Sequence, residues 1–213
     1  MRLRRLVVNP YQENTYLLCA SNGDAWVIDP GMHTTQEYRA FEQILAEEGA
    51  RLTGIYLTHA HIDHVLGVAW VVQKYKVPLF YHAAEEVVYD HAAEYATLMG
   101  LNYVSGPRAD AYLAEGQELT LGDIRVKVLF VPGHSPGHVA FYLPDLGWLL
   151  SGDVLFRGSI GNYELPLASY DTLMQSLREK VLPLGDAVQV WPGHCESTTI
   201  GIEKRSNPFL YAL

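Results

Sequence analysis

The N-terminal part of the chain alternates short apolar runs with polar segments that contain glycine. The apolar runs cover residues 3–8, 15–20, 25–29 and 52–58. Runs of this length, bounded by turn residues, are typical of β-strands. We therefore predict four strands in this part of the chain and place the first at the edge of a sheet.

Helical spacing of apolar residues appears between and after these strands. Thr34 and Glu37 have the spacing of a capping box, and behind them apolar side chains recur at helical intervals from Tyr38 to Leu45. Further helices are predicted over residues 63–75, 83–99 and 169–181. Later strands are predicted at residues 126–131, 147–150 and 187–191.

The order of these elements predicts the fold class. Segments rich in strands, at the start and in the middle of the chain, are each followed by helices. This order predicts an α/β sandwich, with two sheets face to face and helices outside. The length of 213 residues is typical of one domain, so we expect a single domain over residues 1–213.

Composition and charge narrow the classes of partner. A formal net charge of −9 opposes phosphate binding, so no nucleic-acid partner is expected. No segment approaches the roughly 20 apolar residues that span a bilayer, and the apolar run at the N-terminus is too short for a signal peptide. The two cysteines, Cys19 and Cys195, agree with a reducing compartment. We expect a cytoplasmic protein without a membrane partner, and the oligomeric state stays open.

Metal-binding chemistry is concentrated directly after the fourth predicted strand. His59, His61, Asp63 and His64 lie within six residues of one another. His59 and His61 are two apart, so in extended backbone they project to the same side. Asp63 and His64 stand where the next helix begins, near its positive end. Because imidazole and carboxylate are ligands of zinc and similar divalent metals, this loop is predicted to offer four ligands.

Three later strand ends present residues of the same kind. His134, Asp153 and His194 each follow a glycine directly after a predicted strand. Glycine at such places is typical of tight turns in which a side chain approaches its partner closely. One Pro-Gly-His alone would be weak evidence, but three such ends together with the first motif predict a metal site.

The pattern His-x-His-x-Asp-His, followed by a lone His, a lone Asp and a last His, resembles the metallo-β-lactamase superfamily. Within it the chain is most similar to the glyoxalase II-like (hydroxyacylglutathione hydrolase-like) branch of small bacterial hydrolases, through residues 152–156, 158–161 and 198–210. The resemblance implies a four-layer αβ/βα sandwich with metals at one edge. We expect this chain to lack the additional C-terminal helical domain of the longer glyoxalase II enzymes.

The resemblance also implies two divalent metal ions, with zinc expected and iron as the alternative. The first ion would be held by His59, His61 and His134, the second by Asp63, His64 and His194, and both would be bridged by Asp153. Two ions about 3.5–4 Å apart can share a water and lower its pKa toward neutrality. The expected nucleophile is therefore a metal-bound hydroxide, with Asp63 or Asp153 accepting the proton.

The residues around the motifs bear on the substrate. No Ser or Cys nucleophile paired with a base is evident, and no general acid stands beside the ligands. A thiolate, with a pKa of about 8.5, leaves without protonation, whereas an amide nitrogen needs a proton. This comparison favours a thioester, a small-molecule substrate, over a β-lactam.

One departure from the resemblance concerns glutathione. Relatives carry Arg or Lys after residues 158–161, and in glyoxalase II a basic residue there binds the glutathione carboxylate. This chain has Asn162, followed by Tyr163, so the charge-assisted contact is lost. Arg157 is a candidate to compensate. We name Asn162, Tyr163 and Arg157 as candidate substrate-binding residues.

Several alternatives stay open. A persulfide dioxygenase would bind one Fe(II) through His59, His134 and Asp153, and a lactone or β-lactam hydrolase would use the same ligands as a thioesterase. A non-catalytic binding module would need a degraded ligand set, and none of the seven residues is missing. Among the other residues, His138 is predicted to support the site and Cys19 to be buried. Cys195, where relatives usually carry glycine, is expected to be packed, with a residue that supports the ligands or a redox-sensitive thiol as the alternatives.

Overall fold

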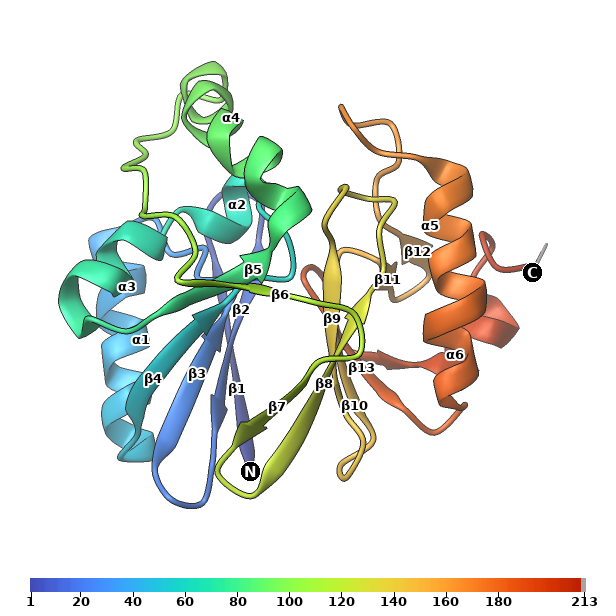
Figure 1. Ribbon diagram of the computed structural model, residues 1–213, viewed down its shortest axis with the longest axis horizontal. Coiled ribbons are helices and arrows are strands. Elements are labelled where there is room, and N and C mark those ends of the chain that lie inside the picture. The colour runs from blue at the N-terminus through green and yellow to red at the C-terminus, as the bar shows by residue number, and fades with distance from the viewer. Residues whose placement is uncertain (212–213) are drawn as a thin grey trace. The chain divides into compact units, whose positions relative to one another are not determined.

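The computed structural model describes residues 1–211, which form two compact units (Figure 1). The first unit comprises Met1–Leu113 and Thr120–Ile124. The second comprises Ala114–Leu119 and the chain from Arg125 onward. Since one domain can contain two such units, the single domain over residues 1–213 stays a prediction.

The sheet of the first unit is mixed. In order, its strands are β1 (Arg2–Val8), β2 (Glu13–Cys19), β3 (Asp24–Ile28), β4 (Arg51–Tyr56), β5 (Leu79–His82) and β6 (Ala111–Leu113). Strands β1 to β3 pair antiparallel, whereas β3 to β6 run parallel. The four predicted strands are confirmed, and β1 lies at the sheet edge as expected. Because β3 and β4 are parallel, their carboxyl ends reach the same edge of the sheet.

Helix α1 (Thr35–Glu48) begins with the predicted capping box. The Thr34 hydroxyl accepts the N–H of Glu37, and the Glu37 carboxylate accepts the N–H of Thr34. The helix ends at Gly49, whose φ of 58° is left-handed and therefore suits glycine.

The prediction of one continuous helix over residues 63–75 is wrong. It is two helices, α2 (Ile62–Val65) and α3 (Val68–Tyr75), separated at Gly67. The Gly67 N–H donates to the Pro30 carbonyl at 2.7 Å, and a Cβ on Gly67 would meet that same oxygen at 2.7 Å. A distant segment of backbone therefore sets the break, while the apolar pattern runs across it.

The helix predicted over residues 83–99 begins differently from the expectation. A short 3₁₀ turn, η1 (Ala83–Glu85), leads into α4 (Glu86–Leu98). Nδ1 of His82 accepts the N–H of Ala84 and so caps the 3₁₀ turn. Helices often start with such a turn, which no hydrophobic spacing reports.

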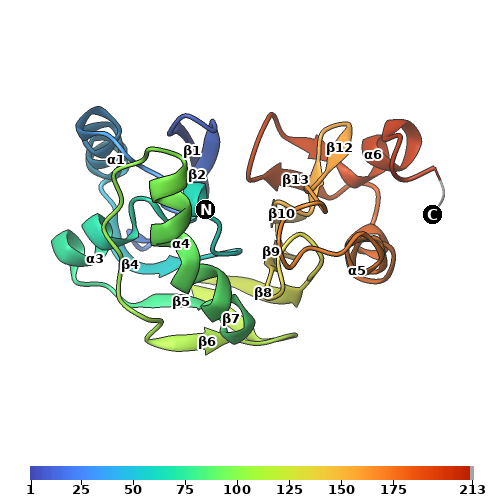
Figure 2. The same ribbon diagram turned by 90° about the horizontal axis from the view of Figure 1, so that it is seen from above.

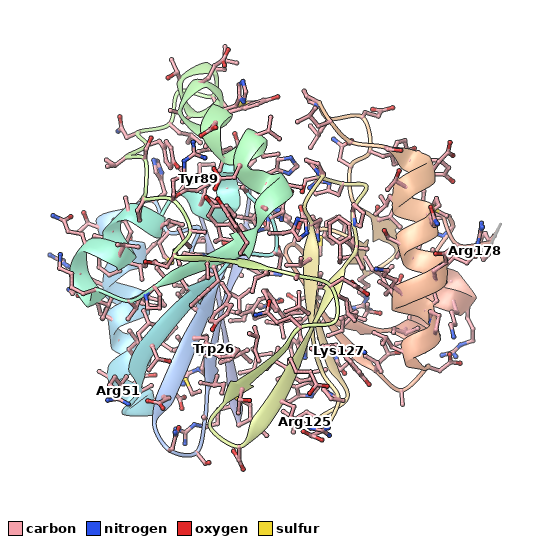
Figure 3. The ribbon with its side chains drawn as sticks, in the orientation of Figure 1. Trp26, Arg51, Tyr89, Arg125, Lys127 and Arg178 are labelled. Atoms are coloured by element: carbon pink, nitrogen blue, oxygen red, sulfur yellow. The ribbon has the colours of Figure 1, made fainter. Side chains whose placement is uncertain are left out.

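The two faces of the first sheet are buried in different ways. One face packs with α1, α3 and α4 in an apolar cluster that includes Phe41, Ile55 and Val71. The opposite face carries a row of rings across β3, β4 and β5, with centroids 4.2 Å apart for Trp26 and Tyr56 and 4.7 Å for Tyr56 and Phe80 (Trp26 is labelled in Figure 3). Burial on both faces fixes the strands that end at the histidine loop.

The second sheet, most of which belongs to the second unit, is also mixed. In order, its strands are β14 (Thr198–Thr199), β13 (Gln189–Pro192), β10 (Trp148–Gly152), β9 (Val139–Leu143), β8 (Ile124–Phe130) and β7 (Glu118–Leu121). The three later predicted strands are confirmed as β8, β10 and β13. Strands β10 and β13 pair in parallel, so they end at the same edge of the sheet. Asp153 follows β10 and His194 follows β13, and both residues therefore lie at this edge.

Helices and one small hairpin complete the second unit. The hairpin consists of β11 (Leu155–Phe156) and β12 (Ser159–Ile160). The helical segments are α5 (Tyr170–Ser176), η2 (Leu177–Val181), η3 (Leu182–Leu184) and α6 (Ile200–Ser206). The predicted helix over residues 169–181 has the right span, but from Leu177 onward its turns are π-helical.

The core of the second unit lies between its sheet and its helices. Leu173, Leu177 and Val181 pack with Leu149 and Val190 in one apolar cluster. Figure 2 shows α5 and α6 beside this sheet. Within residues 1–211 no helix combines the length and the apolarity needed to cross a bilayer.

Candidate metal centre

A buried aspartate fixes the start of the histidine loop. Asp29 has a left-handed φ of 49° and is almost completely buried at the end of β3. Its Oδ1 accepts the N–H of Thr58 at 2.7 Å, and its Oδ2 accepts the hydroxyl of Thr58 at 2.6 Å. The carboxylate thus ties the end of β4 to the end of its parallel neighbour β3.

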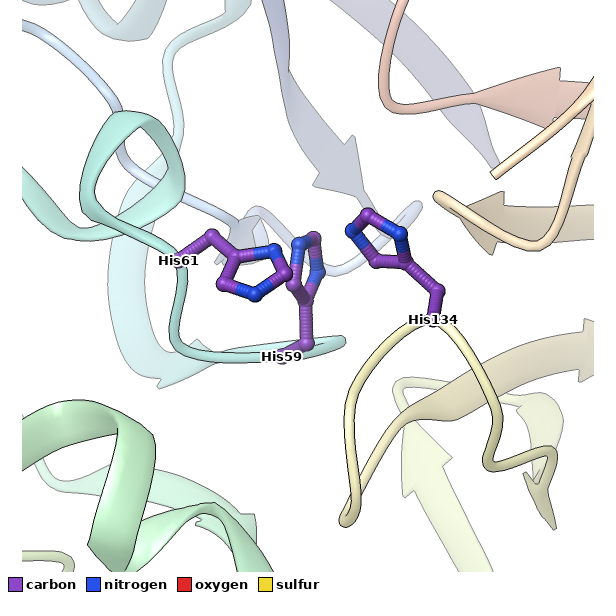
Figure 4. Close-up of side chains that lie close together, drawn as sticks. All are labelled: His59, His61 and His134. Carbon is purple, nitrogen blue, oxygen red and sulfur yellow. The ribbon is translucent and has the colours of Figure 1, made fainter. Parts of the chain in front are cut away.

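The loop after β4 gathers the four residues of the first motif. The ring centroid of His59 lies 4.7 Å from that of His61 and 4.1 Å from that of His64. Nε2 of His64 is 3.7 Å from Oδ2 of Asp63. His59 and His64 are buried, whereas His61 and Asp63 are half-buried. Figure 4 shows the rings of His59 and His61 on this loop.

Hydrogen bonds to Nδ1 orient two of these imidazoles. Nδ1 of His59 lies 3.0 Å from the Thr58 hydroxyl oxygen, and Nδ1 of His64 lies 3.1 Å from Oδ2 of Asp29. Because the single hydroxyl proton of Thr58 goes to Asp29, its oxygen accepts the Nδ1 proton of His59. Nε2 of each ring is then the nitrogen suited to a metal, as is usual for ligating histidines.

Three buried carboxylates around this loop were missed by the sequence analysis. Asp29 follows a strand and precedes Pro-Gly, a signal that could have identified it. Glu85 accepts the N–H of Ala60 at 2.8 Å. Oε1 of Glu13 lies 3.9 Å from Nδ1 of His64. Burial raises the pKa of Glu13 well above its ordinary value, against the lowering effect of the His64 charge. Neither glutamate carries a sequence signal.

The second unit brings together the three remaining predicted ligands. Oδ2 of Asp153 lies 3.6 Å from Nε2 of His134 and 3.5 Å from Nε2 of His194. His134 and Asp153 are buried, and His194 is half-buried. Figure 4 shows His134 on the loop that follows β8. One carboxylate oxygen between two imidazole nitrogens is a donor set that suits a divalent cation.

Backbone contacts orient this second set. Nδ1 of His134 donates to the Asn162 carbonyl at 2.8 Å, which leaves Nε2 as the nitrogen that faces Asp153. The backbone N–H of Asp153 donates to Nε2 of the fully buried His138 at 3.0 Å. His138, which was predicted to support the site, therefore contacts the main chain of a predicted ligand, and its supporting role stays a prediction.

The other predicted residues differ in their surroundings. Asn162 is exposed, and its Oδ1 accepts the N–H of Glu164 at 2.9 Å. Tyr163 is half-buried, and its ring packs edge-to-face against that of Tyr170, with the ring centroids 4.8 Å apart. Arg157 is exposed in the turn of the β11–β12 hairpin.

The two cysteines behave differently from each other. Cys19 is buried, as predicted. The expectation that Cys195 is packed is wrong, because this residue is exposed. Its φ of 66° is left-handed, which is the conformation that favours glycine at this position.

The donor set fits a metal of borderline softness. It consists of imidazole nitrogens and carboxylate oxygens without a thiolate, and the histidines with orienting contacts hold their Nδ1 protons on oxygen acceptors. Zinc and iron both accept such ligands. The assignment of individual residues to ions stays a prediction.

Comparisons with known proteins agree with this chemistry. The family model described as the metallo-β-lactamase superfamily matches residues 8–194. The probable metallo-hydrolase YqgX of Bacillus subtilis is 37% identical, over 99% of this chain and 98% of its own length. Hydroxyacylglutathione hydrolase GloC of Haemophilus influenzae is 34% identical, with the same coverage.

Solved structures show the same similarity. The BLEG-1 B3 metallo-β-lactamase matches with a TM-score of 0.90 and 34% identity, over 99% of this chain and 100% of that chain. TTHA1623, solved in a di-iron-bound form, matches with a TM-score of 0.87 and 39% identity, over 97% of this chain and 100% of that chain. These matches confirm the predicted fold class.

Proposed function

The chain belongs to the metallo-β-lactamase superfamily, and from this premise we propose that it is a binuclear metal-dependent hydrolase of small thioesters. The observation that carries the proposal is that each unit contains a compact set of predicted ligands, and that the rings of His59, His64 and His134 are oriented by contacts at Nδ1. Orientation of this kind is typical of metal ligands and is not needed in a histidine that only fills space.

In the proposed site the two ligand sets act together. His59, His61 and His134 would hold one ion, Asp63, His64 and His194 the other, and Asp153 would bridge them. Two bound ions would supply Lewis acidity and lower the pKa of a shared water to about 7. Zinc is the expected metal. Iron is the alternative, and the di-iron form of the similar TTHA1623 supports it.

The side chains of this chain would divide the remaining work. Asp63, which is half-buried beside His64, would accept the proton of the attacking water. His64 and Asp29 would keep the Asp63 region in place, because Asp29 holds the His64 ring through Nδ1. Asn162, Tyr163 and Arg157 would contact the thiol carrier.

The preference for a thioester comes from the sequence around the ligands, which offers no residue to protonate a leaving group. The direct chain neighbours of the seven predicted ligands include no lysine, tyrosine or glutamate. A leaving thiolate needs no proton, whereas a leaving amide nitrogen does. The similarity to a relative named hydroxyacylglutathione hydrolase supports the same substrate class.

β-Lactam hydrolysis is the second candidate, favoured by the similarity to a B3 metallo-β-lactamase. The ligand set does not separate the two activities, because both need the same ions and water. Because no lysine, tyrosine or glutamate adjoins the predicted ligands in the sequence, the thioesterase stays the leading candidate.

Metal analysis combined with a substrate panel tests the proposal. We expect two zinc or iron ions per chain and a kcat/KM for glutathione thioesters that clearly exceeds the values for a lactone, a β-lactam and a persulfide. Asp153→Asn should keep the fold and lose metal and activity together. One ion per chain with persulfide oxidation, or a β-lactam preference, would replace the proposed activity. Full metal content and turnover in Asp153→Asn would refute the bridging role.

A further inference from the structure

Helix α6 carries a buried carboxylate that the proposed reaction does not use. Glu203 is completely buried. It accepts hydrogen bonds from the backbone N–H of Gly158 at 2.8 Å, from Nδ2 of Asn207 at 2.9 Å and from the Thr198 hydroxyl. Since a buried polar group without partners is costly, three donors on one carboxylate indicate a position that the fold has built for a glutamate.

Glu203 and Asn207 together hold the turn of the β11–β12 hairpin. Glu203 binds the N–H of Gly158, and Nδ2 of Asn207 donates to the carbonyl of the next residue, Ser159, at 2.9 Å. Gly158 has a left-handed φ of 72°, so the turn has a defined shape. Two successive residues of the turn are therefore attached to α6.

Each end of this hairpin leads to a predicted ligand. Strand β11 starts two residues after Asp153, and β12 ends two residues before Asn162, whose carbonyl accepts Nδ1 of His134. Between them, a Cβ on Gly161 would lie 1.9 Å from the Asp153 carbonyl oxygen and 3.1 Å from Cβ of His134. The backbone of Gly161 thus lies against both ligands with no space for a side chain. A shift of the hairpin would move both.

We propose that Glu203 is a positioning residue, which with Asn207 fixes the β11–β12 hairpin on α6 and thereby fixes His134 and Asp153 for metal binding. Only the metal-binding part of this inference rests on the proposed function. The effect on the hairpin and on the His134 ring belongs to the chain itself and can be measured without metal.

The test is Glu203→Gln, which keeps the shape of the side chain but turns one acceptor into a donor. In the metal-free protein, hydrogen exchange at the Gly158 amide should become about tenfold faster. The ¹⁵N spectrum of His134 should change from one tautomer to a mixture. Cobalt titration should show an altered visible spectrum and an affinity about three- to tenfold weaker. Loss of a residue that hydrogen-bonds a ligand directly lowers metal affinity about 10–100-fold, and Glu203 acts less directly, through the hairpin.

Matched variants separate positioning from general stability. Glu179→Gln makes the same chemical change on an exposed residue of the same unit and should leave all three readouts unchanged. Val181→Ala lowers the stability of the same core from another helical segment. It should not alter the cobalt spectrum. Asn207→Ala frees Ser159 but leaves the Gly158 contact in place, so an intermediate effect is expected, and this variant carries the test if Glu203→Gln does not fold.

The outcomes are distinguishable. Unchanged Gly158 exchange and an unchanged cobalt spectrum in Glu203→Gln overturn the inference, as does an equal loss of metal affinity in Glu203→Gln and Val181→Ala. If the wild-type protein binds no metal, the proposed function fails, and the exchange and tautomer measurements still decide whether Glu203 holds the hairpin and the His134 ring.

Discussion

The backbone N–H of Asp153 donates a hydrogen bond to Nε2 of His138 across 3.0 Å. A ring nitrogen that accepts a hydrogen bond carries no proton, so His138 is neutral and is protonated at Nδ1. His138 therefore contacts the predicted ligand Asp153 through the backbone of Asp153.

The first prediction follows from this contact. His138→Leu removes the acceptor and should weaken zinc binding about tenfold. His138→Gln keeps an acceptor and should retain most of the affinity. Competition with a chromophoric chelator measures both. Equal affinity in the two variants, whether high or low, would contradict the assigned role of the Asp153 contact.

The second prediction concerns Asp29, which binds Thr58 and His64 with the same carboxylate. In Asp29→Asn an amide N–H₂ replaces one acceptor and faces donors, so we expect a loss of about 1–3 kcal/mol in the free energy of unfolding. The metal content should also fall from two ions toward one. Urea unfolding and metal analysis check this, with the exposed Asp123→Asn as the matched control. Full metal content would show that His64 does not depend on Asp29.

The third prediction compares two histidines of the first motif. His59→Ala should abolish activity with either zinc or iron, because His59 is assigned to the first ion in both interpretations. His64→Ala should be severe only if the second ion takes part in the reaction. Steady-state kinetics on a thioester, with metal analysis of each variant, decide the matter. Near-normal hydrolysis by His64→Ala would argue against a working binuclear centre.

The fourth prediction tests the carrier. Asn162 is exposed, so Asn162→Arg introduces a charge without burying it. A well-placed charge-assisted contact is worth about 1.5–3 kcal/mol, and less in solvent. We expect a decrease in KM for a glutathione thioester of several-fold to about tenfold, with a smaller change in kcat. A thioester without the glycine carboxylate should not respond. Equal effects on both substrates would mean that this loop does not bind the carboxylate.

The fifth prediction concerns the pH dependence of stability. The Glu37 carboxylate accepts the N–H groups of His33, Thr34 and Asn9 at 2.7 to 2.8 Å. Burial raises the pKa of Glu37, but these three donors lower it by more, so the net shift is downward. A lowered pKa contributes stability above the unfolded value of about 4.3, which is lost as the pH falls through the folded value.

Glu37→Gln should therefore destabilise the protein by about 1 kcal/mol at pH 7, a typical value for a helix-capping contact. The difference between wild type and variant should shrink as the pH falls below about 4. Urea unfolding at pH 7 and at pH 3.5 measures it. A difference that stays constant with pH would mean that the charge of Glu37 does not contribute.

The sequence by itself determined the features that depend on near neighbours. The capping box of Thr34 and Glu37, the strands and the types of the seven predicted ligands all follow from local spacing. Ligands at strand ends can be found in this way because parallel strands of one sheet bring their carboxyl ends to the same edge, as β10 and β13 do for Asp153 and His194.

Only the tertiary structure decided which partners these residues have. The carbonyl of Pro30 breaks the helix at Gly67, and the carbonyl of Asn162 orients His134. Every residue has a carbonyl, so no sequence pattern marks the one that acts. Asp29 and Glu203 act on atoms 35 and 45 positions away in the chain. Contacts of such sequence separation exist only once the chain has folded, because they depend on distance in space rather than on spacing along the chain.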